Sequence, residues 1–408
     1  MTGTGDEAYD IPIRCLAITR FTPLASIEAM QTDICHALRC TGVLVQEHMH
    51  SDYPNFELFR HQLALHGRHE GPRFVFDTNL NHNYDHHGQS IYDAWTLPRF
   101  SFLTDSPARK LDKLGAFPNI GMIGVVDADF IELLSILKAP GKGAIPFQHA
   151  GPPPRKRMRP TAERPIDVMI VGNVSSKLST AEWLDSADKG DPVLRRVLET
   201  CFEDCRTSDK SQWSALLAHA QERGYGISTP STLCDLLQSL ETHVIANRRR
   251  DILSCLGGYR TVFIGGGEAT TDLAVDPEID VRGSLAYLDV LDLMEQTKIV
   301  IDVSPSFRNG AHERVFYALS RGAYVLTEPS RFLTHEVESD LGISFLPYDS
   351  AGVGNAVRAI LDRGPAELDT VRQRAVAHYA DTHTWSQRVA TLMPAIQKLY
   401  WPSAAIAA

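Results

Sequence analysis

The segment best suited to chemistry is IDVSPSFRNGAHERVFYALSRGAYVLTE, which runs from Ile301 to Glu328. In it, a polar loop separates an apolar strand pattern from an amphipathic helix pattern. In an open parallel sheet, ligands bind in such loops at the carboxyl ends of strands. Asn309 and Gly310 permit a tight turn, and the free amides of a helix beginning near His312 favour an anion such as a diphosphate.

Charged side chains in the same segment suit a phosphorylated ligand. Arg308 and Arg314 can donate charge-assisted hydrogen bonds to phosphate oxygens. Glu313 can accept hydrogen bonds from sugar or ribose hydroxyls, and His312 can bind phosphate or neutralise a leaving group. Preorganised donors stabilise the charge that collects on a departing diphosphate, so this chemistry does not strictly require a metal.

At these residues the sequence resembles the group 1 glycosyltransferases with the GT-B fold, and especially the branch related to spore-maturation protein B. The matching positions are Ser304, Pro305, Gly310, His312, Glu313, Arg314, Gly322 and Ala323. The fragments IDVMIVGNVSSK, VFIGGG and VRGSLAYLDVLDLMEQTKIVIDV extend the resemblance over Ile166 to about Leu346. It implies an α/β fold of two Rossmann-like domains whose parallel sheets face a central cleft.

The resemblance also implies roles for residues upstream of the main segment. Gly172, Asn173 and Lys177 are expected near the phosphates of the donor. Arg282, Gly283 and Tyr287 are expected near its nucleotide base. Many members of the family carry two glutamates eight positions apart, where this sequence has Asn309 and Tyr317. Either Glu313 replaces one of them or the donor is held differently.

The first half of the chain offers weaker candidates for the acceptor side of the cleft. Asp105, in LTDSPAR, resembles an Asp-x-Pro turn of the same family. It suits either a general base or a carboxylate that caps its own loop. His149 in FQHAG is a further catalytic candidate in the cleft. The loop DTNLNHNYDHHG has ligand-type side chains at His82, His86 and His87, but their spacing matches no dedicated metal motif. We expect a polar loop or an acceptor-contacting surface rather than a metal site, and the sequence leaves metal binding there open.

Strand patterns alternate with helical patterns along the chain, the order that builds parallel sheets covered on both faces. The strand patterns are Ile13 to Ile18, Val43 to Gln46, Phe74 to Phe76, Phe100 to Leu103, Ile120 to Val126, IDVMIVG, TVFIG, KIVIDVS and AYVLTE. Prolines in GPPPRKRMRPTAERP prevent regular structure and mark a linker.

We therefore expect four parts in the chain. They are an acceptor-side Rossmann-like domain (1–150), a linker (151–165), a nucleotide-sugar-binding Rossmann-like domain (166–384) and a terminal helix (385–408), for which a return to the first domain is one option. The helix pattern from Trp385 to Tyr400 places Val389, Leu392, Ile396 and Leu399 on one face.

Composition excludes several classes of protein. The 408 residues carry a net charge of −10, which argues against nucleic-acid binding because that affinity rests on Lys and Arg. No apolar run is long enough to span a membrane, and the N-terminus lacks the order of a secretory signal. Seven cysteines without CxxC spacing favour a reducing cytoplasm. Neither GxGxxG nor GxxxxGK[ST] is present, which disfavours an NAD enzyme or a P-loop protein.

The expected function is therefore that of a metal-independent, hexosyltransferase-like glycosyltransferase without a cofactor. The expected co-substrate is a UDP-sugar, and the acceptor is a glycan, a protein or a small molecule. A nucleotide-sugar epimerase or another GT-B enzyme would share the donor pocket. A catalytically inactive module that binds a nucleotide sugar or glycan is the alternative outside enzymes, because a fold does not establish a function. The sequence leaves the oligomeric state open.

Overall fold

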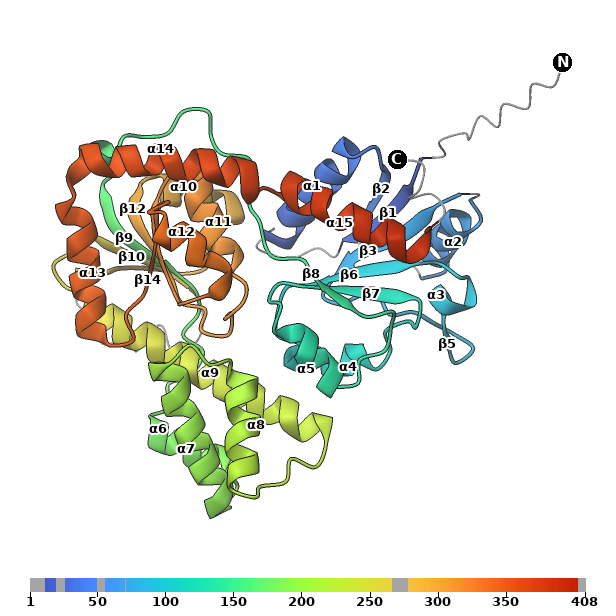
Figure 1. The fold of residues 1–408 in the computed structure, drawn as a ribbon, viewed down its shortest axis with the longest axis horizontal. Coiled ribbons are helices and arrows are strands. Elements are labelled where there is room, and N and C mark those ends of the chain that lie inside the picture. The colour runs from blue at the N-terminus through green and yellow to red at the C-terminus, as the bar shows by residue number, and fades with distance from the viewer. Residues whose placement is uncertain (1–11, 20–25, 50–55, 70, 266–277, 403–408) are drawn as a thin grey trace.

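Two parallel six-stranded sheets organise the protein, which is described by a computed structural model covering residues 12–19, 26–49, 56–69, 71–265 and 278–402 (Figure 1). The first sheet has the order β2-β1-β3-β6-β7-β8. Its strands are β1 (Arg14–Thr19), β2 (Leu44–Met49), β3 (Arg73–Thr78), β6 (Arg99–Leu103), β7 (Gly121–Val125) and β8 (Ala144–Pro146).

The second sheet has the order β11-β10-β9-β12-β13-β14. Its strands are β9 (Ile166–Val171), β10 (Thr261–Ile264), β11 (Asp280–Arg282), β12 (Thr297–Asp302), β13 (Tyr324–Thr327) and β14 (Ile343–Phe345). Counted along the chain, the strands of this sheet lie in the order 3-2-1-4-5-6, so the winding direction reverses between β9 and β12. Ligands of doubly wound sheets bind at the carboxyl ends of the strands at such a reversal.

Helices cover both sheets. Those of the first domain are α1 (Ser26–Cys40), α2 (Phe56–Gly67), α3 (Ile91–Ala94), η2 (Pro107–Lys110), α4 (Leu111–Leu114) and α5 (Phe130–Ile136), with a hairpin of β4 (Asp85–His86) and β5 (Gln89–Ser90). Those of the second domain are α10 (Tyr287–Glu295), α11 (Glu313–Ser320), η5 (Arg331–Leu333), α12 (Thr334–Glu338), α13 (Ser350–Asp362) and α14 (Gly364–Thr382). The linker holds the short η3 (Thr161–Glu163).

The expected two-sheet α/β fold is confirmed, and each expected strand lies within three residues of its predicted bounds. The reason is local: the central residues of β9 (Val168 to Val171) and of β12 (Ile299 to Ile301) are apolar because both faces of a covered parallel sheet are buried. Helix α10 repeats apolar residues at helical spacing at Leu288, Leu291 and Met294, but Leu288 faces solvent with 67% of its surface exposed, whereas Leu291 and Met294 are buried.

Four helices between β9 and β10 were not anticipated from the sequence. They are α6 (Thr180–Ala187), α7 (Pro192–Thr207), α8 (Gln212–Glu222) and α9 (Pro230–Ser254), and they form a helical insertion below the second sheet in Figure 1. Helix α9 reaches the first domain, where Gln238 Nε2 donates to the Ala108 carbonyl at 2.8 Å. The Arg109 guanidinium pairs with Glu241 at 2.8 Å beside it. The insertion therefore belongs in sequence to the second domain but touches both.

The last helix, α15 (Trp385–Tyr400), packs on the first domain beside α1 (Figure 1). Its buried residues Val389 and Ile396 join the core under the first sheet, and the Tyr400 hydroxyl donates to the Ile120 carbonyl at 2.8 Å. Where the chain crosses between the domains, Gly151 N–H donates to the His383 carbonyl at 3.2 Å. The chain passes between the domains twice, once at the linker after Ala150 and once between α14 and α15, and this hydrogen bond joins the two passages.

The packing of α15 makes a prediction about stability. Replacing the fully buried Ile396 by alanine removes apolar contacts with the first domain, so Ile396→Ala should lower the free energy of unfolding by about 2–4 kcal/mol. Leu399→Ala on the same helix, where the side chain is 37% exposed, should cost about 0.5 kcal/mol or less. Urea denaturation of both variants measures the difference, and equal losses would contradict this packing.

Candidate active site

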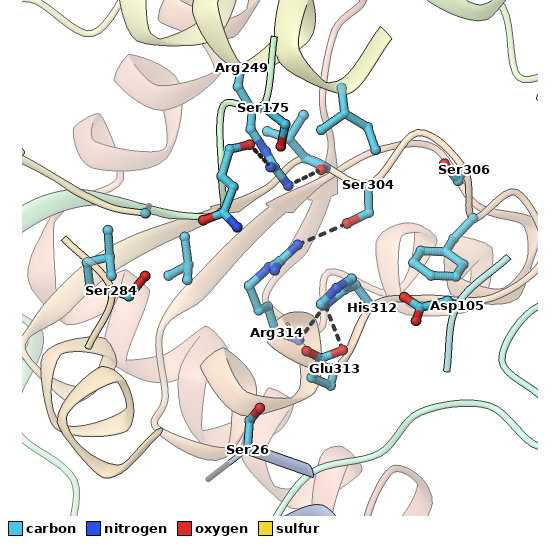
Figure 2. A pocket seen from close by; sticks show the side chains of 18 of the residues that line it. Ser26, Asp105, Ser175, Arg249, Ser284, Ser304, Ser306, His312, Glu313 and Arg314 are labelled. Carbon is cyan, nitrogen blue, oxygen red and sulfur yellow. Dashed lines mark hydrogen bonds and ion pairs between the residues drawn. The ribbon is translucent and has the colours of Figure 1, made fainter. Parts of the chain in front are cut away.

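A cavity of about 550 Å³ opens between the two sheets and is bounded on one side by α9 (Figure 2). Residues following the switch-point strands line it: Gly172 and Asn173 follow β9, and Val303 and Ser304 follow β12. The first domain contributes Ser26 at the start of α1 and the loop after β6. The cavity therefore lies where the topology of the second sheet predicts a ligand.

Three arginines line this cavity, and two of them, Arg249 and Arg314, lie at the strand ends of the second sheet, whereas Arg109 of the first domain pairs with Glu241. Arg249 of α9 is buried, and its terminal nitrogens donate to the main-chain carbonyls of Asn173 and Val303. Arg314 of α11 pairs with Asp302 at 3.0 Å and donates to the Ser304 hydroxyl at 3.3 Å. Burial, together with repulsion from Arg314, lowers the pKa of Arg249 to about 9. A group with this pKa still carries its charge at neutral pH, so the pair favours an anionic ligand.

Gly172 is required by the position of Arg249. Its φ of +149° is unfavourable for a residue with a side chain, and a Cβ there would lie 2.5 Å from the Arg249 guanidinium carbon. The absence of a side chain lets the guanidinium lie against the end of β9. Gly172 therefore determines where the Arg249 guanidinium lies in the cavity, although it has no side chain of its own.

A carboxylate and two imidazoles meet at the start of α11. Glu313 Oε2 lies 2.8 Å from His312 Nδ1 and 3.3 Å from His149 Nε2 (Figure 2 shows the first pair). The 2.8 Å distance requires a proton between the atoms, which we assign to His312 Nδ1. His312 and Glu313 line the cavity, whereas the buried His149 lies behind them.

The environment separates the proton affinities of this group. Burial would raise the pKa of Glu313, but the charge and hydrogen bond of His312, with a smaller effect of Arg314, outweigh burial and hold that pKa well below its usual range. Burial lowers the pKa of His149 to about 4, although Glu313 opposes the shift. At neutral pH Glu313 is therefore an ionised hydrogen-bond acceptor and a weak base, and His149 is neutral.

The structure brings half of the sequence candidates together. The candidates that line the cavity are Asp105, Gly172, Asn173, Tyr287, Ser304, His312, Glu313 and Arg314. Asp105 is 47% exposed by side chain and pairs with Lys110 at 3.2 Å. Tyr287 packs edge-on against Tyr317, which also lines the cavity at a position where the resemblance implies a glutamate.

Three candidates of the central loop do not line the cavity. The Arg308 side chain is buried and donates to the Cys205 carbonyl at 3.4 Å. Asn309 and Gly310 contact Asp127 of the first domain instead. The loop turns away from the end of β12 at these residues. Arg308 therefore contacts the helical insertion, and Asn309 and Gly310 contact the first domain.

The other candidates outside the cavity lie at its margin or beyond. Pro305 is buried, Lys177 is exposed in the loop after β9, and Gly283 is exposed after β11. Arg282 pairs with Asp280 of its own strand at 2.6 Å. None of these four lines the described cavity, so the expectation that they contact phosphates or base does not follow from their positions.

Sequence reasoning missed Arg249, Arg109 and Glu241. The signal was present in the run Arg248 to Arg250, but neighbouring helical residues point in different directions. Arg248 pairs with the buried Glu328 at 3.0 Å, Arg249 faces the cavity, and Arg250 donates to the Leu178 carbonyl at 3.2 Å. Only the rotation of α9 about its own axis, as it packs against the second sheet, decides which of the three arginines faces the cavity.

The histidine-rich loop of the first domain lies in and around the β4–β5 hairpin, away from the cavity. His82 is buried, with Nδ1 3.0 Å from the Tyr84 hydroxyl, and His87 is exposed. His86 belongs to β4, and its side chain is outside the described part of the structure. Asp77 nearby forms a fully buried ion pair with Arg99 at 2.7 Å.

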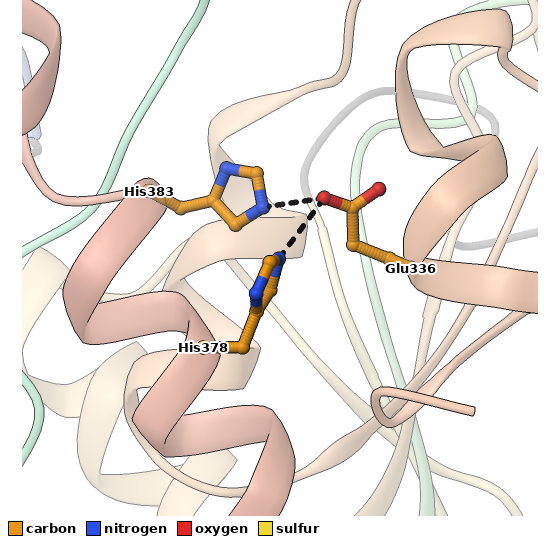
Figure 3. Close-up of side chains that lie close together, drawn as sticks. All are labelled: Glu336, His378 and His383. Atoms are coloured by element: carbon orange, nitrogen blue, oxygen red, sulfur yellow. Dashed lines mark hydrogen bonds and ion pairs between the residues drawn. The ribbon is translucent and has the colours of Figure 1, made fainter. Parts of the chain in front are cut away.

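A second polar cluster, of Glu336, His378 and His383, lies where the chain leaves the second domain (Figure 3). Glu336 Oε1 lies 2.9 Å from His383 Nε2 and 3.3 Å from His378 Nε2. Arg388 donates to His383 Nδ1 at 2.9 Å, which places the proton of that ring on Nε2. A histidine that binds a metal through Nε2 would need that nitrogen free of its proton and would donate from Nδ1. In His383 the positions are reversed, so the cluster fits a hydrogen-bond network rather than a metal site.

Residues 248–394 match the sequence profile of a family described as "Glycosyl transferase-like". No curated protein matches in sequence. No helix among the described residues has the length and apolar character needed to cross a membrane.

Several solved structures share the whole fold. Anabaena HepE, in complex with UDP and glucose, is 12% identical with a TM-score of 0.51, over 94% of this chain and 99% of that chain. Sucrose-phosphate synthase from Thermosynechococcus elongatus is 10% identical with a TM-score of 0.52, over 95% and 99%. An alpha-glucosyltransferase in complex with UDP-glucose and DNA containing an abasic site is 10% identical with a TM-score of 0.53, over 95% and 99%. The protein therefore has the GT-B fold.

The Glu336 network makes a prediction about pH. Burial opposes ionisation of Glu336, but the hydrogen bond and charge of His383, together with a hydrogen bond from His378, lower its pKa from 4.5 to about 2. A lowered folded-state pKa adds stability above about pH 4.5 that is lost as the pH falls towards 2. Glu336→Gln should therefore lower the free energy of unfolding by about 1–3 kcal/mol at pH 7, and by less at pH 3.

Urea denaturation at several pH values measures this dependence. Glu338→Gln on the same helix, at an exposed position, is the matched control and should change stability by about 0.5 kcal/mol or less. A loss for Glu336→Gln that stays constant from pH 7 to pH 3 would contradict the role of its charge.

Proposed function

We propose that the protein is a glycosyltransferase that transfers a sugar from a nucleotide-sugar donor to a hydroxyl-bearing acceptor. The observation that carries the proposal is the convergence of Arg249, Arg314 and the start of α11 on one cavity at the switch point of the second sheet. Three sources of positive potential at that place suit a pyrophosphate. The GT-B fold and the family match over residues 248–394 support the same function.

The donor is proposed to be a UDP-sugar, as bound in the Anabaena HepE and alpha-glucosyltransferase structures. In the reaction, the bond between the anomeric carbon and the phosphate oxygen breaks, and its electron pair remains on the departing UDP. Arg249 and Arg314 would stabilise that charge, so we propose catalysis without a metal or other cofactor. We also propose that the protein belongs to the branch of group 1 glycosyltransferases related to spore-maturation protein B.

The other cavity residues have distinct proposed roles. Glu313, held ionised, accepts hydrogen bonds from hydroxyls of the sugar rather than taking a proton, because its pKa is far below that of an effective base. His149 packs behind Glu313, with Nε2 3.3 Å from the carboxylate. The acceptor hydroxyl forms the new bond to the anomeric carbon and loses its proton. Asp105 lies on the acceptor side and is the proposed base if the reaction inverts the anomeric centre.

The donor assignment is tested by thermal shift with UDP-, GDP-, ADP-, CMP- and TDP-sugars. A ligand at about 100 times its Kd stabilises the folded state by about 2.7 kcal/mol, so UDP-sugars should give the largest shift. Arg249→Met should weaken UDP binding about tenfold or more, because a charge-assisted donor is lost. Arg250→Met, the neighbouring arginine outside the cavity, should leave UDP binding unchanged. Equal UDP affinity in both variants would exclude Arg249 from the phosphate site.

The role of Glu313 is tested by turnover with radiolabelled UDP-glucose. Glu313→Gln keeps the shape of the side chain but removes its charge, so kcat/KM should fall by about a hundredfold while the protein remains folded. Glu295→Gln, which removes an ion-paired carboxylate outside the cavity, is the control. Unchanged turnover in Glu313→Gln would remove Glu313 from the site. Analysis of the labelled product separates transfer from epimerisation and from binding without reaction.

A further inference from the structure

The loop that joins β12 to α11 is held by the first domain as well as by its own. Asn309 N–H donates to Asp127 Oδ2 at 2.7 Å, and Ala128 N–H donates to the Asn309 carbonyl at 3.1 Å. Asp127 and Gly310 pair as an isolated antiparallel bridge. A short stretch of main chain from each domain therefore forms a joint across the cleft.

The fit of this joint is tight. A Cβ at position 310 would lie 2.2 Å from the Val126 carbonyl oxygen, so only glycine allows the two main chains to approach. From the second domain, the Ser330 hydroxyl donates to the Gly310 carbonyl at 2.6 Å. The loop is consequently fixed on both sides at the same residue.

Asp127 is the central side chain of the joint. It is fully buried, and both of its oxygens are used, because Oδ1 accepts the Asp129 N–H at 2.8 Å while Oδ2 accepts Asn309 N–H. Asp129 accepts from Asn309 Nδ2 at 3.2 Å and pairs with Arg331 at 2.6 Å. Arg331 N–H in turn donates to the Arg308 carbonyl at 2.9 Å.

The same loop carries the groups that face the cavity. Ser304 lies at its beginning, and His312, Glu313 and Arg314 lie at its end, all lining the cavity. The joint at Asn309 and Gly310 lies between them and is the part that the first domain holds. The positions of the cavity groups therefore depend on contacts made outside the second domain.

We propose that Asp127 and Asp129 of the first domain are positioning residues for the donor. They fix the loop between β12 and α11, which carries the groups that bind the donor, and do not touch the nucleotide themselves. The inference rests on the proposed function. It means that the donor site is completed only when the two domains are docked. Binding of UDP and docking are then linked, since a ligand that prefers the docked state shifts the equilibrium towards it.

The test uses Asp127→Asn in the full chain. An amide has one acceptor oxygen and cannot satisfy both main-chain N–H groups, so the loop should loosen. We expect UDP to bind about tenfold more weakly by calorimetry, and the amides of residues 307–312 to exchange faster with deuterium without ligand. With UDP-glucose, KM should rise while kcat at saturation stays within about twofold, because saturating donor restores docking.

Two further variants sharpen the result. Arg331→Met removes an exposed partner of Asp129 and should weaken UDP binding by about two- to fivefold without a risk to folding. Asp93→Asn is the matched control, since Asp93 also accepts two main-chain N–H groups, from Asn119 at 2.9 Å and Ile120 at 2.8 Å, within the first domain alone. Asp93→Asn should leave the UDP affinity and the exchange of the loop unchanged.

The outcomes separate the inference from the proposed function. Wild-type protein that binds UDP no better than Asp127→Asn does, with both affinities measurable, overturns the inference alone. The same holds if Asp93→Asn weakens UDP binding as much as Asp127→Asn, or if the loop amides exchange at the wild-type rate. Wild-type protein that fails to bind UDP at all overturns the proposed UDP-dependent function and the inference with it.

Discussion

The buried guanidinium of Arg249 is the constraint on which the site depends. A charged group taken out of water is stable only with good partners, and Arg249 has two main-chain carbonyls from the ends of the central strands β9 and β12. This arrangement requires glycine at position 172, and it requires α9 to end against the second sheet. With Arg314 beside it, the arrangement concentrates positive charge where a doubly wound sheet binds its ligand.

The carboxylates of the cavity differ in character because their surroundings differ. Glu313 is partnered by two histidines and remains ionised, while His149 is buried and stays neutral. Asp105 lies half exposed on the opposite domain beside Lys110. The ion-paired Glu313 and the half-exposed Asp105 therefore face the cavity from different domains and in different surroundings.

Contacts between the domains are part of the site rather than an addition to it. The two chain crossings are bonded to each other through Gly151 and His383, and Arg388 donates from α15 to the His149 carbonyl at 3.2 Å. Helix α9 reaches the first domain through Gln238, and the loop before α11 is held by Asp127. Because these contacts join the two domains, the geometry of Glu313 and Arg314 depends on the relative position of the two sheets.

The sequence alone determined the two parallel sheets and the importance of Ile301 to Glu328, because apolar strands and amphipathic helices are local patterns. It also identified Ser304, His312, Glu313 and Arg314, which directly flank a strand end or begin a helix. Tertiary structure decided the rest. The phase of α9 selected Arg249 among three adjacent arginines, and docking of the first domain turned Asn309 away from the cavity. Both depend on contacts between segments distant in the chain, which no local pattern records.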